Sequence, residues 1–168
     1  EEATYRLEYD SEGTLIRKAN TADASDTTTY DWDSRGRLRG IAGPEVTASF
    51  KYDALDRRIE RTINGVTLRA IYDGVQMIGE LAGGVVEPTY LTGLQIDEML
   101  VRSTAAGART YLTDALGSVM AQTDEDQTPI NWYGYSPYGE VAVVGDDEQS
   151  PVQYTGREND RTGLYYYR

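Results

Sequence analysis

The sequence predicts an all-β protein in which β-hairpins form a curled or spiral antiparallel sheet with almost no helix. Three observations lead to this fold class. An aromatic residue followed by Asp recurs about every 20 residues, which is the mark of a repeat protein. The segments between these pairs alternate polar and apolar residues, and none keeps a 3.6-residue apolar period for long. A unit of about 20 residues holds two short strands and two turns, but not a strand plus a crossover helix.

The repeated unit is a turn sequence that begins with the aromatic residue and Asp. The aromatic is expected to end a strand, Asp to accept backbone N–H bonds, and Gly to supply a positive φ. In the third copy Asp56 takes the glycine position, which Asp tolerates better than most residues. The four copies are Tyr9-Asp10-Ser11-Glu12-Gly13, Trp32-Asp33-Ser34-Arg35-Gly36, Tyr52-Asp53-Ala54-Leu55-Asp56 and Tyr72-Asp73-Gly74.

The alternating pattern predicts about sixteen strands along the chain. Sixteen strands at ~4.8 Å spacing would span roughly 75 Å, and open twisted sheets rarely exceed about ten strands, so the sheet is expected to curl. A curled sheet that does not close keeps two edges able to pair with more chain or another copy. The clearest expected strands are Thr28–Asp33, Val46–Tyr52, Val66–Asp73, Arg109–Thr113, Ser118–Thr123 and Ile130–Tyr135. The expected hairpin tips are Ala19–Asp26, Asp124–Thr128 and Gly145–Ser150.

Composition is that of one folded domain with an acidic surface. The chain has 168 residues, 39% of them hydrophobic, and 14 Tyr among its aromatics, which suits a half-buried sheet. A net charge of −12 argues against nucleic acid and anionic lipid as partners. No apolar run approaches the roughly 18 residues of a membrane helix, so no membrane span is expected. The chain opens on Glu1 without a signal-peptide pattern, and the missing Met indicates a piece of a longer polypeptide.

From about residue 90 the units change character, and three motifs follow one another. They are Tyr111-Leu112-Thr113-Asp114-Ala115-Leu116-Gly117-Ser118-Val119, then Trp132-Tyr133-Gly134-Tyr135-Ser136-Pro137-Tyr138-Gly139-Glu140, and then Tyr154-Thr155-Gly156-Arg157-Glu158-Asn159-Asp160 leading to Thr162-Gly163-Leu164-Tyr165-Tyr166-Tyr167-Arg168. With these motifs the chain resembles the Rhs/YD-repeat family, and its second half resembles the Rhs-repeat-associated core segment. The resemblance covers nearly the whole chain and is strongest from Asp114 to Arg168.

The resemblance implies a structural role. Repeats of that family wind into a hollow β-sheet shell, and in many members the core segment leads into a C-terminal toxin enclosed by the shell. It implies hairpin repeats over 1–110 and a core region over 111–168 that is continuous with the same sheet. The repeat and core positions expected to matter are Tyr9, Asp10, Gly13, Trp32, Asp33, Gly36, Tyr52, Asp53, Tyr72, Asp73, Asp114, Gly117, Tyr135, Pro137, Gly139, Gly156, Arg157, Glu158, Asp160, Gly163 and Leu164.

Few residues offer catalytic chemistry, and no catalytic residue, metal or cofactor is predicted. The absence of His and Cys removes the usual general base, the thiol nucleophile and common zinc ligands. Lys18 and Lys51 lie at ordinary strand positions with no nucleophile motif nearby. The clusters Asp124-Glu125-Asp126 and Asp146-Asp147-Glu148 are expected to be solvated loop tips, with weak Ca²⁺ binding as the alternative.

Two charged sets and the Tyr residues have alternative interpretations. Arg157, Glu158 and Asp160 are expected to form a salt-bridged turn before the last strand; the family resemblance instead places them near a self-cleavage apparatus of aspartyl type. Arg57, Arg58 and Arg61 are expected to pair with carboxylates of neighbouring strands, with anion binding as the alternative. The Tyr residues are expected to pack within the sheet, and stacking on a cell-surface glycan is the alternative.

Three functions remain in competition. The leading one is a structural shell segment of a secreted or cell-surface protein, whose partners are the rest of a longer repeat chain and a toxin-like cargo. The second is an extracellular fibre or adhesion module that joins copies, or a partner protein, through open sheet edges. The third is a self-cleaving core, which would need sequence beyond Arg168, so the chain itself is predicted not to be an enzyme.

Overall fold

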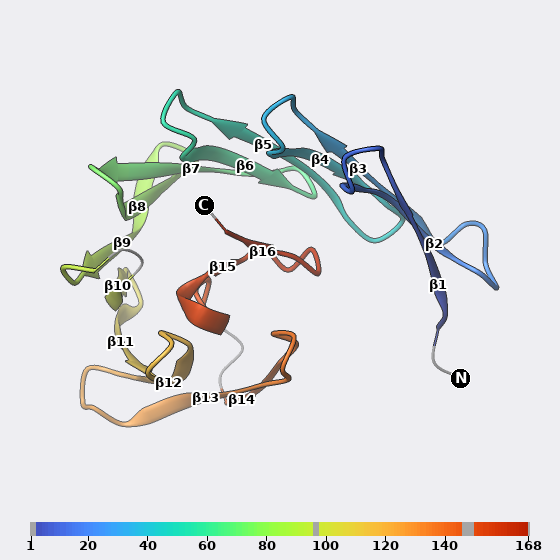
Figure 1. Ribbon diagram of the computed structural model, residues 1–168. Coiled ribbons are helices and arrows are strands. Elements are labelled where there is room, and N and C mark those ends of the chain that lie inside the picture. Colours follow the sequence, from blue (N-terminus) through green and yellow to red (C-terminus); the bar gives the residue numbers. More distant parts are fainter. Residues whose placement is uncertain (1–2, 96–97, 146–149, 168) are drawn as a thin grey trace. The chain divides into compact units, whose positions relative to one another are not determined.

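The computed structural model describes residues 3–95, 98–145 and 150–167 (Figure 1). Fourteen of its strands belong to one antiparallel sheet, in which each strand neighbours the next along the chain. The chain divides into two compact units, Glu1–Leu68 (unit 1) and Arg69–Arg168 (unit 2). Strands and a single short 3₁₀ turn make up the regular structure of the described ranges. In those ranges no helix is long and apolar enough to cross a membrane.

Unit 1 is a series of antiparallel hairpins. Alternating half-buried and exposed positions along its strands reflect a sheet with two accessible faces. Its fully buried residues within the described part are Ile41, Phe50 and Arg58. The strands that begin in unit 1 are β1 (Tyr5–Tyr9), β2 (Leu15–Asn20), β3 (Thr27–Trp32), β4 (Leu38–Ala42), β5 (Thr47–Tyr52), β6 (Arg58–Ile63) and β7 (Val66–Asp73).

In unit 2 the hairpin series continues, and the chain then leaves the sheet for a short separate segment. Within this unit strands β8 to β14 curve around the last part of the chain (Figure 1). The strands of the sheet are β8 (Gln76–Ala82), β9 (Val85–Thr92), β10 (Met99–Thr104), β11 (Gly107–Thr113), β12 (Val119–Thr123), β13 (Pro129–Tyr135) and β14 (Val141–Gly145). After them come the 3₁₀ turn η1 (Tyr154–Gly156) and a separate two-stranded sheet of β15 (Glu158–Asn159) and β16 (Tyr165–Tyr166).

The predicted fold class is confirmed: the chain is an antiparallel all-β protein made of successive hairpins. All six of the clearest predicted strands are present, with ends that differ by at most two residues. Most of the expected tip Gly145–Ser150 lies outside the described residues. β14 is the last strand of the large sheet, and after it β15 and β16 pair with each other in a sheet of their own.

The main core lies in unit 2, between the sheet and the segment of residues 150–167, named here the fold-back segment. Val152 of the fold-back segment joins a buried apolar cluster contributed by the strands β8 to β13. The strand members of this cluster are Met77, Tyr90, Met99, Tyr111, Val119 and Tyr133. The sheet face on which the fold-back segment lies is called the covered face below.

Candidate functional site

Within the described residues, five turns share one hydrogen-bond pattern built on Asp. The Asp N–H donates to the carbonyl of the residue four positions on, and the residue three positions on donates to the Asp carbonyl. The Asp Oδ1 accepts the N–H groups two and four positions on, at 2.8–3.0 Å. The carboxylate thus satisfies the donors that a tight turn leaves unpaired. These turns begin at Asp10, Asp33, Asp53, Asp114 and Asp124.

A sixth turn keeps the pattern with Ser136 in place of Asp. The Ser136 hydroxyl accepts the Glu140 N–H at 3.1 Å, and the Gly139 N–H donates to the Ser136 carbonyl at 3.0 Å. When the Asp or Ser is counted as position one, position four of these six turns has a positive φ, for example +85° at Gly13 and at Gly139. Asp56 holds this position at +66°, as predicted, and Gln127 holds it at +63°. The Gln127 position was missed, although its spacing from Asp124 matches the repeat.

The fourth predicted unit folds differently. Asp73 lies inside β7 and pairs with Gln76 of β8, so the connection is the two-residue turn Gly74-Val75. Gly74 has φ +58° at the first central position, where two-residue hairpins commonly carry Gly. Tyr72-Asp73-Gly74 is therefore a correction to the prediction of four equivalent turns. The shorter loop leaves no room for the Asp pattern described above.

The aromatic residue before the turn fastens one hairpin to the preceding one. The Trp32 Nε1–H donates to the Leu15 carbonyl at 2.8 Å, the Tyr52 hydroxyl to the Leu38 carbonyl at 2.9 Å, and the Tyr135 hydroxyl to the Val119 carbonyl at 2.7 Å. Each acceptor is the first residue of a strand that follows an earlier turn. The sheet register shifts at the aromatic position, as at Trp32 and Tyr52, which produces the extra bend expected of a bulge. The repeat therefore specifies both the turn and the contact between successive hairpins.

Arg side chains reinforce two turns of unit 1. Arg37 binds Asp33 through two nitrogens at 2.7 and 2.6 Å, and these hydrogen bonds lower the pKa of Asp33 to about 2. Arg57 binds Asp53 in the same way, and although partial burial opposes it, the pKa of Asp53 is also lowered. Arg57 thus pairs within its own turn, whereas pairing with a neighbouring strand was expected. Asp56 accepts hydrogen bonds from Arg35 and Arg37, both at 2.6 Å, which links two successive turns.

A buried polar network holds the fold-back segment on the covered face. Gln122 of β12 is completely buried, and its Oε1 accepts hydrogen bonds from Asn131 Nδ2 at 3.0 Å and from the Tyr133 hydroxyl at 2.6 Å. The Tyr133 oxygen in turn accepts the Ser150 N–H at 2.9 Å. The Gln153 Nε2 donates to the Ser150 carbonyl at 3.1 Å. The chain is thus connected from two sheet strands to the first residues of the fold-back segment without a solvent-exposed link.

Three further contacts continue this attachment. The Val119 N–H donates to the Gln153 carbonyl at 3.2 Å, and the Thr155 N–H donates to the Ser118 hydroxyl at 3.0 Å. The Tyr165 hydroxyl donates to the Gly139 carbonyl at 2.9 Å. Buried polar groups are costly unless paired, so such a set tolerates one arrangement of the segment and penalises others. Here Gln122, Asn131, Tyr133, Ser150 and Gln153 are named the polar lock.

Burial also raises the pKa values of the tyrosine hydroxyls around the polar lock. It raises the pKa of Tyr111 to about 12, and it raises the pKa of Tyr133, Tyr135 and Tyr165 above the ordinary tyrosine value. All four hydroxyls are therefore protonated and uncharged at neutral pH, and those of Tyr133, Tyr135 and Tyr165 make the hydrogen bonds described above. Sequence reasoning missed the polar lock, because polar residues on an alternating strand predict a face turned to solvent.

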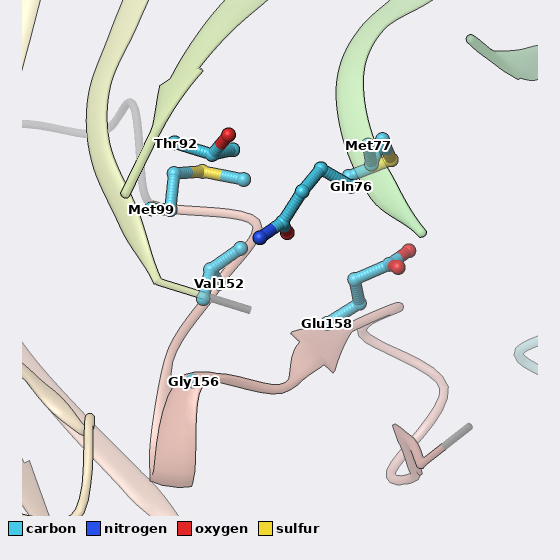
Figure 2. Close-up of a pocket in the computed structure, with 7 residues that line it drawn as sticks. All are labelled: Gln76, Met77, Thr92, Met99, Val152, Gly156 and Glu158. Atoms are coloured by element: carbon cyan, nitrogen blue, oxygen red, sulfur yellow. The ribbon is translucent and has the colours of Figure 1, made fainter. Parts of the chain in front are cut away.

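A small cavity of about 20 Å³ lies where the fold-back segment meets β8, β9 and β10. Figure 2 shows the Gln76 side chain reaching toward Met99 and Val152, and Glu158 extending from β15 toward the strand that carries Gln76. Gln76 Nε2 donates to the Gln95 carbonyl at 2.6 Å. The remaining lining residues are Met77, Thr92 and Gly156.

The predicted core residues Arg157, Glu158 and Asp160 occupy the fold-back segment. Glu158 pairs with Tyr166 in the small sheet and is 8% exposed, and Asp160 is 9% exposed. The Arg157 guanidinium lies over the Tyr167 ring, 5.3 Å from its centroid. Gly163 has φ +81° in the turn between β15 and β16, and Leu164 beside it is half-buried. Pro137 is exposed, and its carbonyl accepts the Tyr154 hydroxyl at 3.1 Å.

The lysines and acidic clusters have structural contacts. Lys18 Nζ lies 4.1 Å from the centroid of the Tyr5 ring, and Lys51 Nζ lies 2.6 Å from a Glu60 oxygen. Glu125 Oε1 accepts the Ala108 N–H at 3.0 Å, so it links the turn at Asp124 to the start of β11. Among the described residues no group of three or more acidic side chains is placed to hold a metal ion. The cluster Asp146-Asp147-Glu148 lies outside the described residues.

The repeated turn, the hairpin order and the fold-back segment define a structural β-sheet repeat protein. The sequence model of the family "Teneurin YD-shell" matches residues 2–161, and the chain therefore belongs to the teneurin YD-shell family. This confirms the resemblance to YD and Rhs shell proteins inferred from the motifs, and it gives the chain a structural, shell-type role.

Related proteins include several toxins. The chain is 28% identical to "Double-stranded DNA deaminase toxin A" of Burkholderia cenocepacia over 96% of its length, and 28% identical to "Toxin subunit YenC2" of Yersinia entomophaga over 91%. It spans only 14% and 16% of those proteins. Among solved structures, the Photorhabdus luminescens Tc holotoxin pore matches 97% of the chain with a TM-score of 0.63 and 16% identity, over 11% of that chain. That likeness concerns the fold.

Proposed function

We propose that this chain is a stretch of the β-sheet wall of a shell in a secreted or cell-surface protein, and that the shell encloses a toxin-like region of the longer polypeptide. One observation carries the proposal. After β14 the chain leaves the sheet, and the fold-back segment lies on the covered face, held there by the completely buried Gln122 and Gln153. A chain that continues from this segment starts on the covered face and not at the outer edge of the sheet.

The relatives support a toxin as the kind of cargo, but they assign no reaction to it. Those named as a deaminase toxin and as a toxin subunit contain a similar stretch as a small part of a much longer protein. Their activities therefore belong to those proteins as wholes, and the cargo of this chain is proposed as toxin-like without an assigned reaction. The partners proposed are the rest of the repeat chain and that cargo.

For the chain itself we propose a role without catalysis. The residues that the repeat and core motifs single out fulfil structural tasks: Asp33 and Asp53 close turns, Trp32 and Tyr135 join hairpins, and Gly139 receives the Tyr165 hydroxyl. Lys18 and Lys51, which have no nucleophile motif nearby, contact Tyr5 and Glu60. This assignment predicts that no single side chain of the stretch is required for turnover by the longer protein's cargo once that cargo is free.

The test is protease protection in the longer native polypeptide that carries this stretch. The polar lock is opened by the double variant Gln122→Leu and Tyr133→Phe, and the control is Leu55→Ser at a turn residue that is 74% exposed. We expect the region after the fold-back segment to resist protease in the wild type and in the control, and to be cleaved in the lock variant. Rapid cleavage of that region in the folded wild type would overturn enclosure.

The open sheet edges support a second function, which is a fibre or adhesion module. Within the sheet order of the described strands, β1 and β14 each have one neighbour, and Val144 of β14 is 71% exposed. Unpaired edges favour strand addition by another copy. Sedimentation velocity over a hundredfold concentration range distinguishes the two functions: growth of assemblies with unprotected cargo favours a fibre or adhesion module, whereas a constant mass with protected cargo favours the shell.

A further inference from the structure

The cavity in Figure 2 contains an unmet hydrogen-bond requirement. Gln76 Nε2 donates to the Gln95 carbonyl at 2.6 Å, which fixes the orientation of the amide. The other amide atom, Gln76 Oε1, is buried and accepts no hydrogen bond from the described residues. A buried carbonyl oxygen without a donor costs about 1–3 kcal/mol. The site therefore favours a ligand that can donate a hydrogen bond.

The other polar groups around the cavity narrow the ligand further. Glu158 brings a carboxylate, which accepts hydrogen bonds at several positions, and Thr92 brings a hydroxyl that both donates and accepts. Met77, Met99 and Val152 add apolar atoms to the lining. A ligand here must be very small, must donate at least two hydrogen bonds, and must tolerate apolar walls.

We propose that a single water molecule is bound in this cavity and bridges Gln76 of β8 to Glu158 of β15. The volume of about 20 Å³ exceeds the roughly 10–15 Å³ that one water requires. Water also meets the usual condition of two to four polar partners, which Gln76, Glu158 and Thr92 supply. The water adds a link between the sheet and the fold-back segment through β8, a strand that contributes no residue to the polar lock. This inference does not depend on enclosure of a cargo.

The three methionines of the chain provide the test. Met77 and Met99 line the cavity, whereas Met120 is 42% exposed. With ¹³C-labelled methionine methyl groups, we expect long-lived water to give strong cross-relaxation peaks to the Met77 and Met99 methyls of the wild-type protein. Met120 is the internal control, because surface water exchanges too quickly to give such a peak. Folded protein with no water peak at Met77 or Met99 would overturn the proposal.

Two further NMR experiments identify the ligand. Replacing Gln76 by Leu removes the acceptor, and the water peaks at Met99 are expected to fall at least threefold while the Met120 signal stays unchanged. A monovalent cation is the competing ligand, since it too binds carboxylate and carbonyl oxygens. Addition of ¹⁵N-labelled ammonium distinguishes them: ammonium peaks at Met99 that replace the water peaks would show a cation site and contradict a bound water.

Discussion

Unit 1 and unit 2 use the same turn, but they cover the apolar side chains of the sheet by different means. Unit 2 folds its own chain back over one face and buries an apolar cluster there. Unit 1 has three fully buried residues in the described part, and long basic side chains lie over several of its aromatic rings. Examples are Lys18 over Tyr5 at 4.1 Å, Arg37 over Tyr52 at 4.9 Å and Arg58 over Phe50 at 5.1 Å.

The charge distribution follows this difference. Unit 1 carries 10 of the 16 basic residues of the chain, and unit 2 carries 15 of the 28 acidic ones. An Arg or Lys stem covers apolar surface while its charged end stays in water, and a cation over a ring adds a favourable contact. The comparison teaches that the repeated turn builds a sheet by itself, whereas a core requires either a folded-back segment or side chains long enough to cover the rings.

The largest expected effect comes from opening the polar lock. Gln122→Leu removes the acceptor of Asn131 Nδ2 and of the Tyr133 hydroxyl, both buried, so the free energy of unfolding of unit 2 should fall by about 2–5 kcal/mol. The two tryptophans allow each unit to be followed in urea, because Trp32 lies in unit 1 and Trp132 in unit 2, and each has one indole N–H signal. An equal loss of both signals at all urea concentrations would contradict a lock that is local to unit 2.

The second prediction compares the same turn position in the two units. Gly13 and Gly139 both have φ +85°, so Ala at either position should cost about 1–2 kcal/mol for the left-handed backbone. A Cβ at Gly13 meets nothing within 4 Å, whereas one at Gly139 lies 2.9 Å from the Tyr154 ring. Gly139→Ala should therefore cost about 1–3 kcal/mol more than Gly13→Ala because of overpacking.

Urea unfolding of the two glycine variants, read at Trp132 for Gly139→Ala and at Trp32 for Gly13→Ala, measures this difference. The added variant Tyr154→Leu supplies the control, since a smaller side chain opposite Gly139 should reduce the extra loss. Similar losses for the two Ala variants would show that Tyr154 moves aside freely, and the fold-back segment would then be less tightly packed than the contacts indicate.

These comparisons also show what the sequence could specify. The turns were predictable, because Asp10 or Asp33 acts on backbone groups within four residues of itself. The polar lock was not, because Gln122 and Gln153 lie 31 positions apart and their polarity alone predicts exposure. Gln127 belongs between these cases: its distance from Asp124 carries the signal, but the residue type does not.

The third prediction concerns position four of the turn where it is not glycine. Gln127 has φ +63° in unit 2, and Gln127→Gly should stabilise the fold by about 0.5 kcal/mol, the net of relieved backbone strain and greater unfolded-state entropy. Asp56 has φ +66° in unit 1, but its carboxylate accepts hydrogen bonds from Arg35 and Arg37. Asp56→Gly should therefore give no gain. Thermal unfolding of both variants checks the pair, and a gain for Asp56→Gly would show that the Arg contacts contribute nothing.

The smallest expected effect is a difference in acid sensitivity between equivalent turns. The pKa of Asp33 is lowered to about 2 by Arg37, below the value of roughly 3.9 in an unfolded chain. A lowered folded-state pKa means that the charge stabilises the fold above about pH 4 and that this contribution disappears as the pH falls toward 2. Asp33→Asn keeps an oxygen for the turn but loses the charge, so its deficit in stability should be present at pH 7 and should vanish near pH 2.

Asp114→Asn is the matched control for acid sensitivity, because its turn makes the same backbone bonds but has Ser118 at the position that Arg37 occupies in the Asp33 turn. Urea midpoints between pH 2 and pH 7, read at Trp32 for Asp33→Asn and at Trp132 for Asp114→Asn, give the two profiles. A deficit for Asp33→Asn that does not change with pH would mean that the turn depends on carboxylate shape and not on its charge. The Arg residues of unit 1 would then act only as covers for aromatic rings, and the two units would share one turn chemistry throughout.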